Sequence, residues 1–268
     1  MSLWKTIREK LLGGNAAPST NLGAKLNEAY ILIKSKDYEK ARRILLAILD
    51  SQESIQDAAT RGWIVDSLAQ TWLFQEQFRE QITFSSDYAS RYPDDCLGYR
   101  ARAEALWYEN HLSDAIGDYS RAIELNATDI LSRSGRGQVL AELGRSTDAI
   151  GDLDFALQLL DTARNTDRTR LEWCRDIESF VRRGRGVALA ASGQIGDAMH
   201  EFARSLTLNP DNAWAYYSRA RVYDQQAEQQ HALADYSTAI TKSGPPLTPI
   251  QRELARTRIN ALSQRRES

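Results

Sequence analysis

The sequence predicts an all-α protein built from antiparallel helix pairs, and three observations support this fold class. Ala, Leu, Arg, Glu and Gln are common while Val is sparse, which is typical of a helix-forming chain. The segment HLSDAIGDYSRAIELNATD at 111–129 aligns without a gap with RSTDAIGDLDFALQLLDTA at 145–163, an offset of 34 residues. Related segments recur at 194–212 and 231–240, so one helical unit is repeated along the chain.

The repeated unit resembles the 34-residue tetratricopeptide repeat (TPR), a helix–turn–helix with small residues at positions 8, 20 and 27. Small side chains at these positions let two antiparallel helices approach closely. Positions 8 and 20 are occupied by Ala29, Ala69, Ala103, Gly137, Gly186 and Ala220, and by Ala41, Ala115, Ala149, Ala198 and Ala232. The second repeat departs from the pattern at Gln81, Ser85 and Tyr88. The resemblance implies a right-handed α-solenoid, a TPR superhelix of about six antiparallel helix pairs.

The repeat pattern predicts a division of the chain into three parts. Residues 1–21 are an N-terminal amphipathic arm and linker, residues 22–246 the solenoid, and residues 247–268 a C-terminal capping helix. Within the solenoid we place repeats at 22–55, 62–95, 96–129, 130–163, 179–212 and 213–246, with an insertion at 164–178.

The insertion and the C-terminus both show helical patterns. In the insertion, Leu171, Cys174 and Ile177 recur every three residues, which favours one helix that continues into the fifth repeat. Near the C-terminus, Thr248 is expected to cap a helix in which Pro249 is the first residue and Gln251 completes a capping box. We expect an apolar stripe on this helix to cover the end of the solenoid, formed by Ile250, Leu254, Ile259 and Leu262.

Four repeats carry an arginine at position 7, where the family usually has an apolar residue. These four repeats, and not the first two, also carry an acid at position 23 of the second helix. Positions 7 and 23 differ by two residues in height, about 3 Å, which a guanidinium can span. We therefore expect structural ion pairs between the two helices of each repeat, although each acid could instead meet the arginine of the next repeat. The expected pairs are Arg102–Asp118, Arg136–Asp152, Arg185–Glu201 and Arg219–Asp235.

No constellation in the sequence indicates catalysis, a metal site or a cofactor. The three histidines have no i, i+4 spacing, and the glycines at 184–193 precede no phosphate-binding Lys-Ser/Thr. A net charge of −2 argues against a nucleic-acid surface, and no apolar run is long enough for an integral membrane segment. The two cysteines are too few for a disulfide framework, so we expect a cytoplasmic protein. Because no catalytic constellation is present, we also expect it to be non-enzymatic.

The resemblance implies that the first helices of successive repeats line a concave groove that binds a protein or peptide partner. Positions 2, 5, 9, 12 and 13 would face this groove, and Trp, Tyr and Arg at such positions are typical of binding hot spots. For the aromatic residues the alternative is packing against the preceding repeat. The partner-binding residues expected are Tyr30, Asp66, Gln70, Phe74, Arg100, Glu104, Trp107, Tyr108, Arg183, Tyr217 and Arg221. The lysine, asparagine and arginine set with which some family members clamp a chaperone's C-terminal carboxylate is absent from every three consecutive repeats.

Three alternatives remain open from the sequence. In the first, the protein is a membrane-peripheral assembly factor that an N-terminal amphipathic helix recruits to a surface. The apolar residues of this helix would be Leu3, Trp4, Ile7, Leu11 and Leu12. Liposome co-sedimentation of the full chain, compared with a chain that lacks residues 1–21, separates this function from peptide binding. The other two alternatives are an enzymatic site at the insertion and self-association through an end face of the solenoid.

Overall fold

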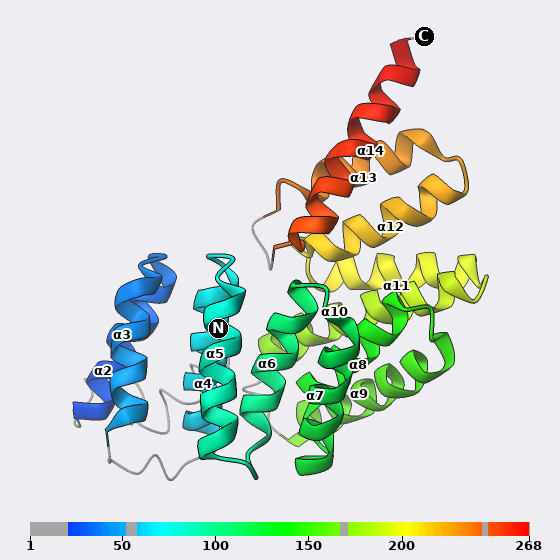
Figure 1. The fold of residues 1–268 in the computed structure, drawn as a ribbon. Coiled ribbons are helices and arrows are strands. Elements are labelled where there is room, and N and C mark those ends of the chain that lie inside the picture. Colours follow the sequence, from blue (N-terminus) through cyan, green and yellow to red (C-terminus); the bar gives the residue numbers. More distant parts are fainter. Residues whose placement is uncertain (1–20, 52–57, 167–170, 243–245, 268) are drawn as a thin grey trace.

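The computed structural model describes residues 21–51, 58–166, 171–242 and 246–267, and these ranges contain thirteen helices and no strand (Figure 1). In chain order they are α2 (Asn21–Lys34), α3 (Tyr38–Asp50), α4 (Ala58–Leu73), α5 (Phe78–Arg91), α6 (Cys96–Tyr108), α7 (Leu112–Leu125), α8 (Ile130–Glu142), α9 (Ser146–Thr166), α10 (Leu171–Ala191), α11 (Ile195–Leu208), α12 (Ala213–Gln225), α13 (Gln229–Ala239) and α14 (Pro249–Glu267). The predicted fold class, an all-α solenoid, is confirmed. The expected N-terminal amphipathic segment lies outside the described residues.

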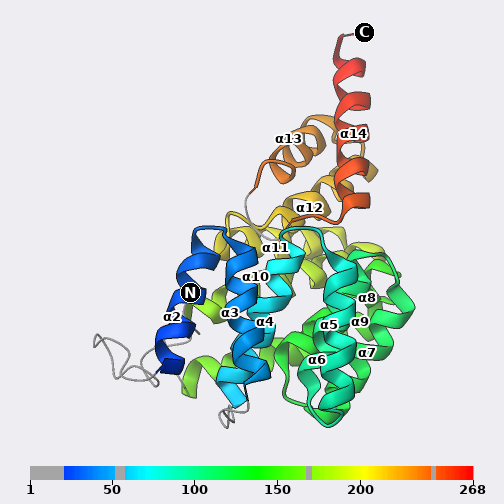
Figure 2. The ribbon, with the colours of Figure 1, turned by 60° about the vertical axis from the view of Figure 1, so that its left-hand side comes forward.

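Successive helices form antiparallel pairs, from α2 with α3 to α12 with α13, and the pairs stack side by side (Figures 1 and 2). The stack turns along its length, so that α2 to α5 stand upright in Figure 1 while α11 and α12 run across the view. The first helices of the later pairs also contact one another in succession, α4 with α6, α6 with α8, α8 with α10 and α10 with α12. Because these helices meet across repeats, they form the side of the stack that we call the inner face.

Small residues at the predicted positions allow the two helices of a repeat to pack at close range. Ala103 and Ala115 are fully buried where α6 meets α7. In the next two repeats even an alanine would be too large at position 8. A Cβ atom on Gly137 would lie 2.7 Å from Leu153 Cγ, and one on Gly186 would lie 2.7 Å from Phe202 Cε1. The large residue at position 24 fills the space that the glycine leaves.

The second repeat departs from the family pattern because it buries polar side chains there. Gln81 is fully buried in α5, and its side-chain amide donates to the carbonyl of Ala101 at 3.0 Å in the following repeat. Ser85 is also fully buried and donates to the carbonyl of Gln81 one turn earlier. The hydroxyl of Tyr88 donates to Asp95 Oδ2 at 2.9 Å. Hydrogen bonds, one of them to the following repeat, thus replace part of the apolar packing.

Two long helices enclose the insertion. Residues 164–166 end α9, which begins at Ser146, and residues 171–178 begin α10, which continues to Ala191. Both helices have 21 residues, compared with 13 or 14 in α6, α7 and α8. Residues 167–170, the middle of the insertion, lie outside the described part of the chain.

The C-terminal helix has the predicted cap but a different packed stripe. Gln251 N donates to Thr248 Oγ1 at 3.2 Å, and Thr248 N donates to Gln251 Oε1 at 3.4 Å, which forms the capping box. Ala255 and Leu262 are buried. The prediction that Ile250 and Leu254 belong to the same stripe is wrong, since these side chains are 50% and 52% exposed. Ile250 directly precedes Gln251 and Leu254 directly precedes Ala255, so both point about 100° away from the packed side of the helix.

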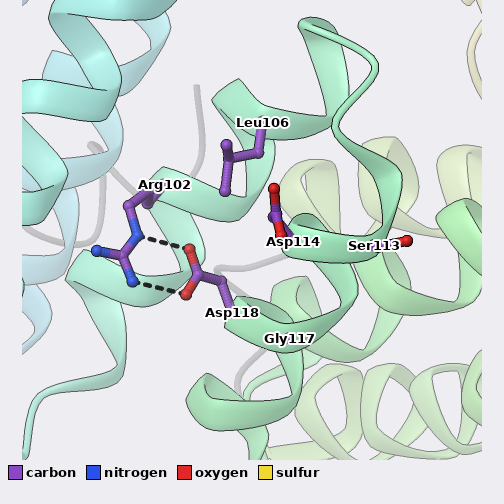
Figure 3. A pocket seen from close by; sticks show the side chains of 6 residues that line it. All are labelled: Arg102, Leu106, Ser113, Asp114, Gly117 and Asp118. Carbon is purple, nitrogen blue, oxygen red and sulfur yellow. Dashed lines mark hydrogen bonds and ion pairs between the residues drawn. The ribbon is translucent and has the colours of Figure 1, made fainter.

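Ion pairs between positions 7 and 23 connect the two helices of the repeats. Arg102 Nε and Nη2 donate to the two carboxylate oxygens of Asp118 at 2.6 and 2.7 Å (Figure 3). This pair borders a hollow of about 410 Å³ between α6 and α7, which Leu106 also lines. Arg136 and Asp152 form the same bidentate pair at 2.6 and 2.8 Å. The pair of Arg219 and Asp235 has distances of 2.6 and 2.9 Å.

The same arginines also reach back to the second helix of the preceding repeat. Arg102 Nη1 donates to Ser86 Oγ at 3.4 Å, and Arg136 Nη1 donates to Ser120 Oγ at 3.0 Å. Each serine stands at position 25 of its repeat, 16 residues before the arginine. One guanidinium therefore joins three helices. The carboxylate comes from the arginine's own repeat, and the preceding repeat supplies a serine instead of the acid of the alternative pairing.

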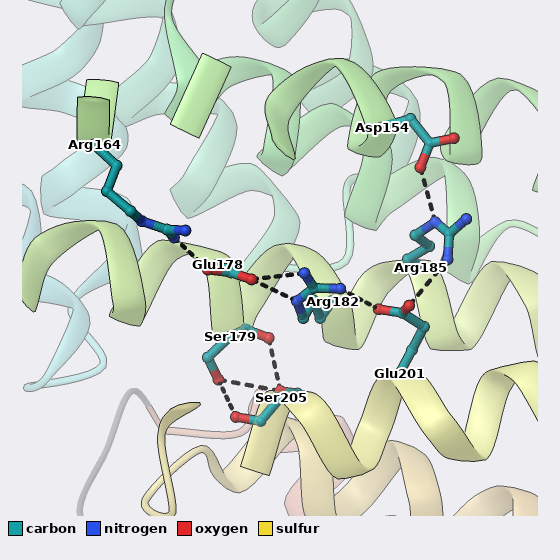
Figure 4. A network of polar contacts seen from close by, with 8 residues as sticks. All are labelled: Asp154, Arg164, Glu178, Ser179, Arg182, Arg185, Glu201 and Ser205. Atoms are coloured by element: carbon teal, nitrogen blue, oxygen red, sulfur yellow. Dashed lines mark hydrogen bonds and ion pairs between the residues drawn. The ribbon is translucent and has the colours of Figure 1, made fainter. Parts of the chain in front are cut away.

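Arg185 divides its donors between two acids (Figure 4). Its Nε donates to Asp154 Oδ1 on α9 at 2.8 Å, and its Nη1 donates to Glu201 Oε1 on α11 at 3.0 Å. Asp154 occupies position 25, where the second and third repeats have serine. Arg182 Nη1 donates to the other oxygen of Glu201 at 3.2 Å and its Nε donates to Glu178 at 2.7 Å, which extends the network along α10.

A double-mutant cycle on Arg102 and Asp118 tests whether the pair stabilises the solenoid. Breaking a buried pair costs about 3–5 kcal/mol, and Arg102 is partly exposed, so Arg102→Leu or Asp118→Leu alone should cost up to about 3 kcal/mol. The double variant should cost at least about 1 kcal/mol less than the sum, because neither charge is left alone. The same cycle on the exposed pair Arg121–Glu124 is the control, with a coupling below about 0.5 kcal/mol. Urea unfolding measures all the values, and additive losses at Arg102 and Asp118 would contradict the prediction.

Candidate interaction surface on the inner face

The structure places the residues expected to bind a partner in three environments. Gln70, Phe74 and Arg221 are exposed. Tyr30, Asp66 and Glu104 are half-buried. The remaining five, Arg100, Trp107, Tyr108, Arg183 and Tyr217, are buried. The expectation that these five residues face an open groove is therefore wrong, because all five are buried.

Three first helices converge on an aromatic cluster at the inner face. Trp107 and Tyr108 end α6, Phe180 lies on α10, and Trp214 lies in the first turn of α12. The ring centroids of Trp107 and Trp214 are 4.9 Å apart, and those of Trp107 and Phe180 are 6.0 Å apart. The third repeat thus contacts the fifth and the sixth directly. The curvature of the solenoid brings these helices together and closes the groove at this point.

Arg183 is buried inside the aromatic cluster with an incomplete set of partners. Its side chain is 1% exposed, and its guanidinium carbon lies 4.7 Å from the centroid of Trp214 and 5.3 Å from that of Phe180. Nη1 is 3.5 Å from Glu142 Oε1, while Nε and Nη2 have no hydrogen-bond partner among the described residues. Burial lowers the pKa of Arg183 to about 10, because removal from water disfavours the charged form.

Residues 246–251 of the same chain cover the aromatic cluster. The indole nitrogen of Trp214 donates to the carbonyl of Pro246 at 2.9 Å, and the hydroxyl of Tyr108 donates to the same carbonyl at 3.2 Å. Leu247 is 3% exposed and belongs to the same buried cluster. We call the surface formed by Trp107, Tyr108 and Trp214, which residues 246–247 cover, the closed pocket.

Arg100, which was expected to contact a partner, connects three repeats instead. It is 8% exposed, donates to Asp66 on α4, and donates to Asp129 Oδ1 at 2.8 Å. Asp129 also accepts a hydrogen bond from the backbone N–H of Ser132 and so caps α8. Arg100 and its two acids thus fix the register of α4, α6 and α8, and no donor of this arginine faces an open groove.

Glu104 lies one turn after Arg100 on α6, next to this network. Gln81 Nε2 lies 3.5 Å from Glu104 Oε2, and the carboxyl is half-buried between α4 and α6. Burial, together with the nearby charge of Asp66, raises the pKa of Glu104 to about 7. Glu104 therefore changes its charge close to neutral pH.

The inner face of the second repeat presents an aromatic side chain to solvent. Phe74, directly after α4, is 38% exposed and stacks on Tyr38 with ring centroids 5.9 Å apart. Gln70 is exposed one turn before Phe74. On α2, Ile31 is 55% exposed, but it stands at position 10, which the repeat pattern does not assign to the groove. We call the two groove-position residues, Gln70 and Phe74, the open surface.

Sequence reasoning missed two contributors to this face. Glu142 accepts a hydrogen bond from the indole of Trp107 at 3.0 Å and also contacts Arg183 and Gln251. It stands at position 13 of its repeat, which the family pattern assigns to the groove, so this signal was available. The covering segment 246–251 was assigned to the junction between solenoid and cap, and the pattern within the repeats contains nothing that places it on α6.

Metal ligation and membrane spanning have no structural basis in the described part of the chain. In those ranges, no group of three or more His, Cys, Asp or Glu side chains is arranged to hold a metal ion. None of the helices described here combines the length and the apolar character needed to cross a bilayer. Cys96 is half-buried and Cys174 is buried, and the two are not joined by a disulfide.

Comparison with known proteins gives short sequence matches. No protein-family model matches the chain. "Tetratricopeptide repeat protein 36" of Caenorhabditis elegans is 37% identical over 60 residues, which cover 22% of this chain and 34% of that protein. "DnaJ homolog subfamily C member 7 homolog" of Schizosaccharomyces pombe is 26% identical over 143 residues, 52% of this chain and 29% of that protein. The matches span about a third of the length of these curated relatives.

Comparison with solved structures extends over most of the chain. A tetratricopeptide repeat protein from Parabacteroides merdae has a TM-score of 0.50 and 15% identity, and the match covers 89% of this chain and 97% of that one. A thermophilic TPR protein from Thermus thermophilus has a TM-score of 0.53 and 16% identity, with 74% and 99% covered. At this identity the likeness shows the fold, and that fold agrees with the helix pairs described above.

The raised pKa of Glu104 predicts how stability depends on pH. The folded state binds this proton more tightly than the unfolded chain, where the pKa is near 4.5, so this carboxyl should reduce stability as pH rises from about 4.5 to 7. Glu104→Gln should remove that loss and exceed the wild type by about 1–2 kcal/mol at pH 8 but not at pH 4.5. Glu124→Gln, at an exposed position, controls for the loss of a carboxylate. Thermal unfolding at both pH values measures the difference, and an equal effect at both would contradict the prediction.

Arg183 and Arg100 are both buried at position 5, and their different pairing predicts losses of stability of different size for the same substitution. Arg183→Met removes two unpaired N–H groups and should change the free energy of unfolding by less than about 1 kcal/mol, in either direction. Arg100→Met leaves Asp66 and Asp129 without their cation and should cost at least about 3 kcal/mol. Urea unfolding of the two variants distinguishes them. Equal destabilisation would show that the unpaired groups of Arg183 carry no cost.

Proposed function

We propose that this tetratricopeptide-repeat solenoid is a non-enzymatic protein-interaction scaffold that holds a peptide or helix of a partner protein on its inner face. The proposal places the partner on the open surface, Gln70 and Phe74, together with the half-buried acids Asp66 and Glu104. Tyr30, half-buried on α2, is a further candidate contact. Arg221, exposed on α12, remains a candidate contact at the other end of the same face.

The observation that carries the proposal is the exposure of an aromatic side chain on an inner face that is otherwise packed. Phe74 is 38% exposed at the second repeat, whereas the groove-position residues Trp107, Tyr108, Trp214 and Tyr217 of later repeats are buried. An aromatic residue stacked on a second ring is held in place before a partner arrives, which lowers the entropic cost of binding. The exposed amide of Gln70 supplies hydrogen-bonding groups at the rim.

The alternative function, a membrane-peripheral assembly factor, depends on residues 2–12, which lie outside the described part of the chain. It stays a separate proposal with its own liposome experiment.

Affinity capture with matched aromatic variants tests the open surface. Phe74→Ala should remove the captured partner, because it deletes the exposed ring at the centre of the surface. Phe155→Ala is the control, since Phe155 is also 38% exposed but lies on α9, a second helix. Circular dichroism checks that both variants stay folded. If the partners captured by the wild type persist with Phe74→Ala, or disappear equally with Phe155→Ala, the open surface is not the binding site.

A further inference from the structure

The segment that covers the closed pocket is seated there as a peptide ligand would be. Its backbone at 246–248 is not helical, and two side-chain donors converge on one carbonyl, that of Pro246. The next side chain, Leu247, is buried among aromatic rings. Recognition by carbonyl contacts from Trp and Tyr, with an apolar side chain in an aromatic-lined pocket, is the way in which grooves bind extended, proline-containing peptides.

The walls of the closed pocket support one another without the covering segment. Trp214 lies 4.9 Å from Trp107 and 5.7 Å from Tyr108, between ring centroids, and Phe78 stacks on the far side of Tyr108 at 5.4 Å. The carbonyl of Pro246 is 138 residues from Tyr108 along the chain. The rings of α6 and α12 therefore contact one another directly, without a residue of the covering segment between them.

The covering segment leaves buried polar groups beside the pocket without hydrogen-bond partners among the described residues. Beneath Trp214, Arg183 keeps two buried N–H groups unpaired. Gln251 reaches Glu142 at a long 3.4 Å. The adjoining turns of α14 leave Ile250 and Leu254 half-exposed, so little apolar packing holds this end of the helix down. Such a segment can open locally while the rest of α14, anchored through Ala255 and the Arg258–Asp224 pair, stays in place.

We infer that the closed pocket is a second peptide-binding site, occupied here by the chain's own residues 246–248. Its partner is an extended, proline-containing peptide that places an aliphatic side chain in the position of Leu247. The preceding carbonyl of that peptide accepts from Trp214 and Tyr108. This site is separate from the open surface, and it extends the proposed function to a ligand of defined chemistry.

Occupation in cis sets how tightly a free peptide can bind. A tethered segment acts at an effective concentration on the order of millimolar, so the wild type binds a competing peptide weakly. A substitution that weakens the covering segment should therefore raise the affinity for the same peptide in trans. Leu247→Ser removes the anchoring side chain and leaves Trp107, Tyr108 and Trp214 intact.

Calorimetric titration of the full chain with an acetylated and amidated peptide of residues 246–251 (PLTPIQ) tests the inference. We expect Leu247→Ser to bind the peptide at least about tenfold more tightly than the wild type. Adding Tyr108→Phe, which keeps the ring and removes the hydroxyl, should weaken that binding about fivefold. Leu254→Ser, on the exposed side of α14, is the matched control and should bind like the wild type. A peptide with serine in place of its leucine should not bind.

A second measurement keeps the test independent of how well Leu247→Ser folds. In the wild type, excess peptide should speed amide hydrogen exchange at 249–254, because the start of α14 is released, while exchange in α2 and α3 stays unchanged. The inference is overturned if a folded Leu247→Ser fails to bind the peptide, if Tyr108→Phe leaves binding unchanged, or if exchange at 249–254 does not respond. None of these outcomes affects the open surface, whose test depends on Phe74.

Discussion

The ion pair between the two helices of a repeat is the interaction on which much of the solenoid depends. A guanidinium at position 7 takes the place of an apolar side chain, so its charge must be met inside the helix pair. The acid at position 23 supplies that charge with bidentate geometry in three repeats. The remaining N–H group of Arg102 and of Arg136 reaches the preceding repeat. The pairs therefore constrain the stacking of repeats as well as the packing within each repeat.

Buried arginines paired with acids also occur at position 5 of the first helices, closer to the inner face. Arg100 at position 5 meets Asp66 at position 5 of the preceding repeat and Asp129, the N-cap of α8. Arginines thus occupy two sites, position 7 between the helices of four repeats and position 5 at Arg100 and Arg183. Arg183 meets one acid, Glu142, at 3.5 Å, and its other neighbours are aromatic rings. This change from ionic to aromatic packing coincides with the place where the groove closes.

Closure divides the inner face into two regions of different character. The second repeat keeps Phe74 at the surface, while α6, α10 and α12 bury their aromatic side chains against each other and against residues 246–251. Aromatic residues at groove positions therefore serve two purposes in one chain, packing in the later repeats and exposure in the earlier ones. A partner that binds the open surface would meet a preformed ring pair, whereas one that binds the closed pocket must first displace the chain's own segment.

The sequence by itself determined the helix pairs, because a period of 34 residues and small side chains at fixed positions leave few other ways to bury the apolar faces. It also indicated which arginine meets which acid, since both members of a pair lie within one repeat and differ little in height along the helices. Only the tertiary structure decided which groove residues are accessible. Burial of Trp107, Tyr108 and Arg183 depends on how far the stack curves, and contacts between α6 and α12, or between Tyr108 and Pro246, join residues more than 100 positions apart. Curvature is the sum of small rotations between repeats, and no local pattern in the sequence encodes that sum.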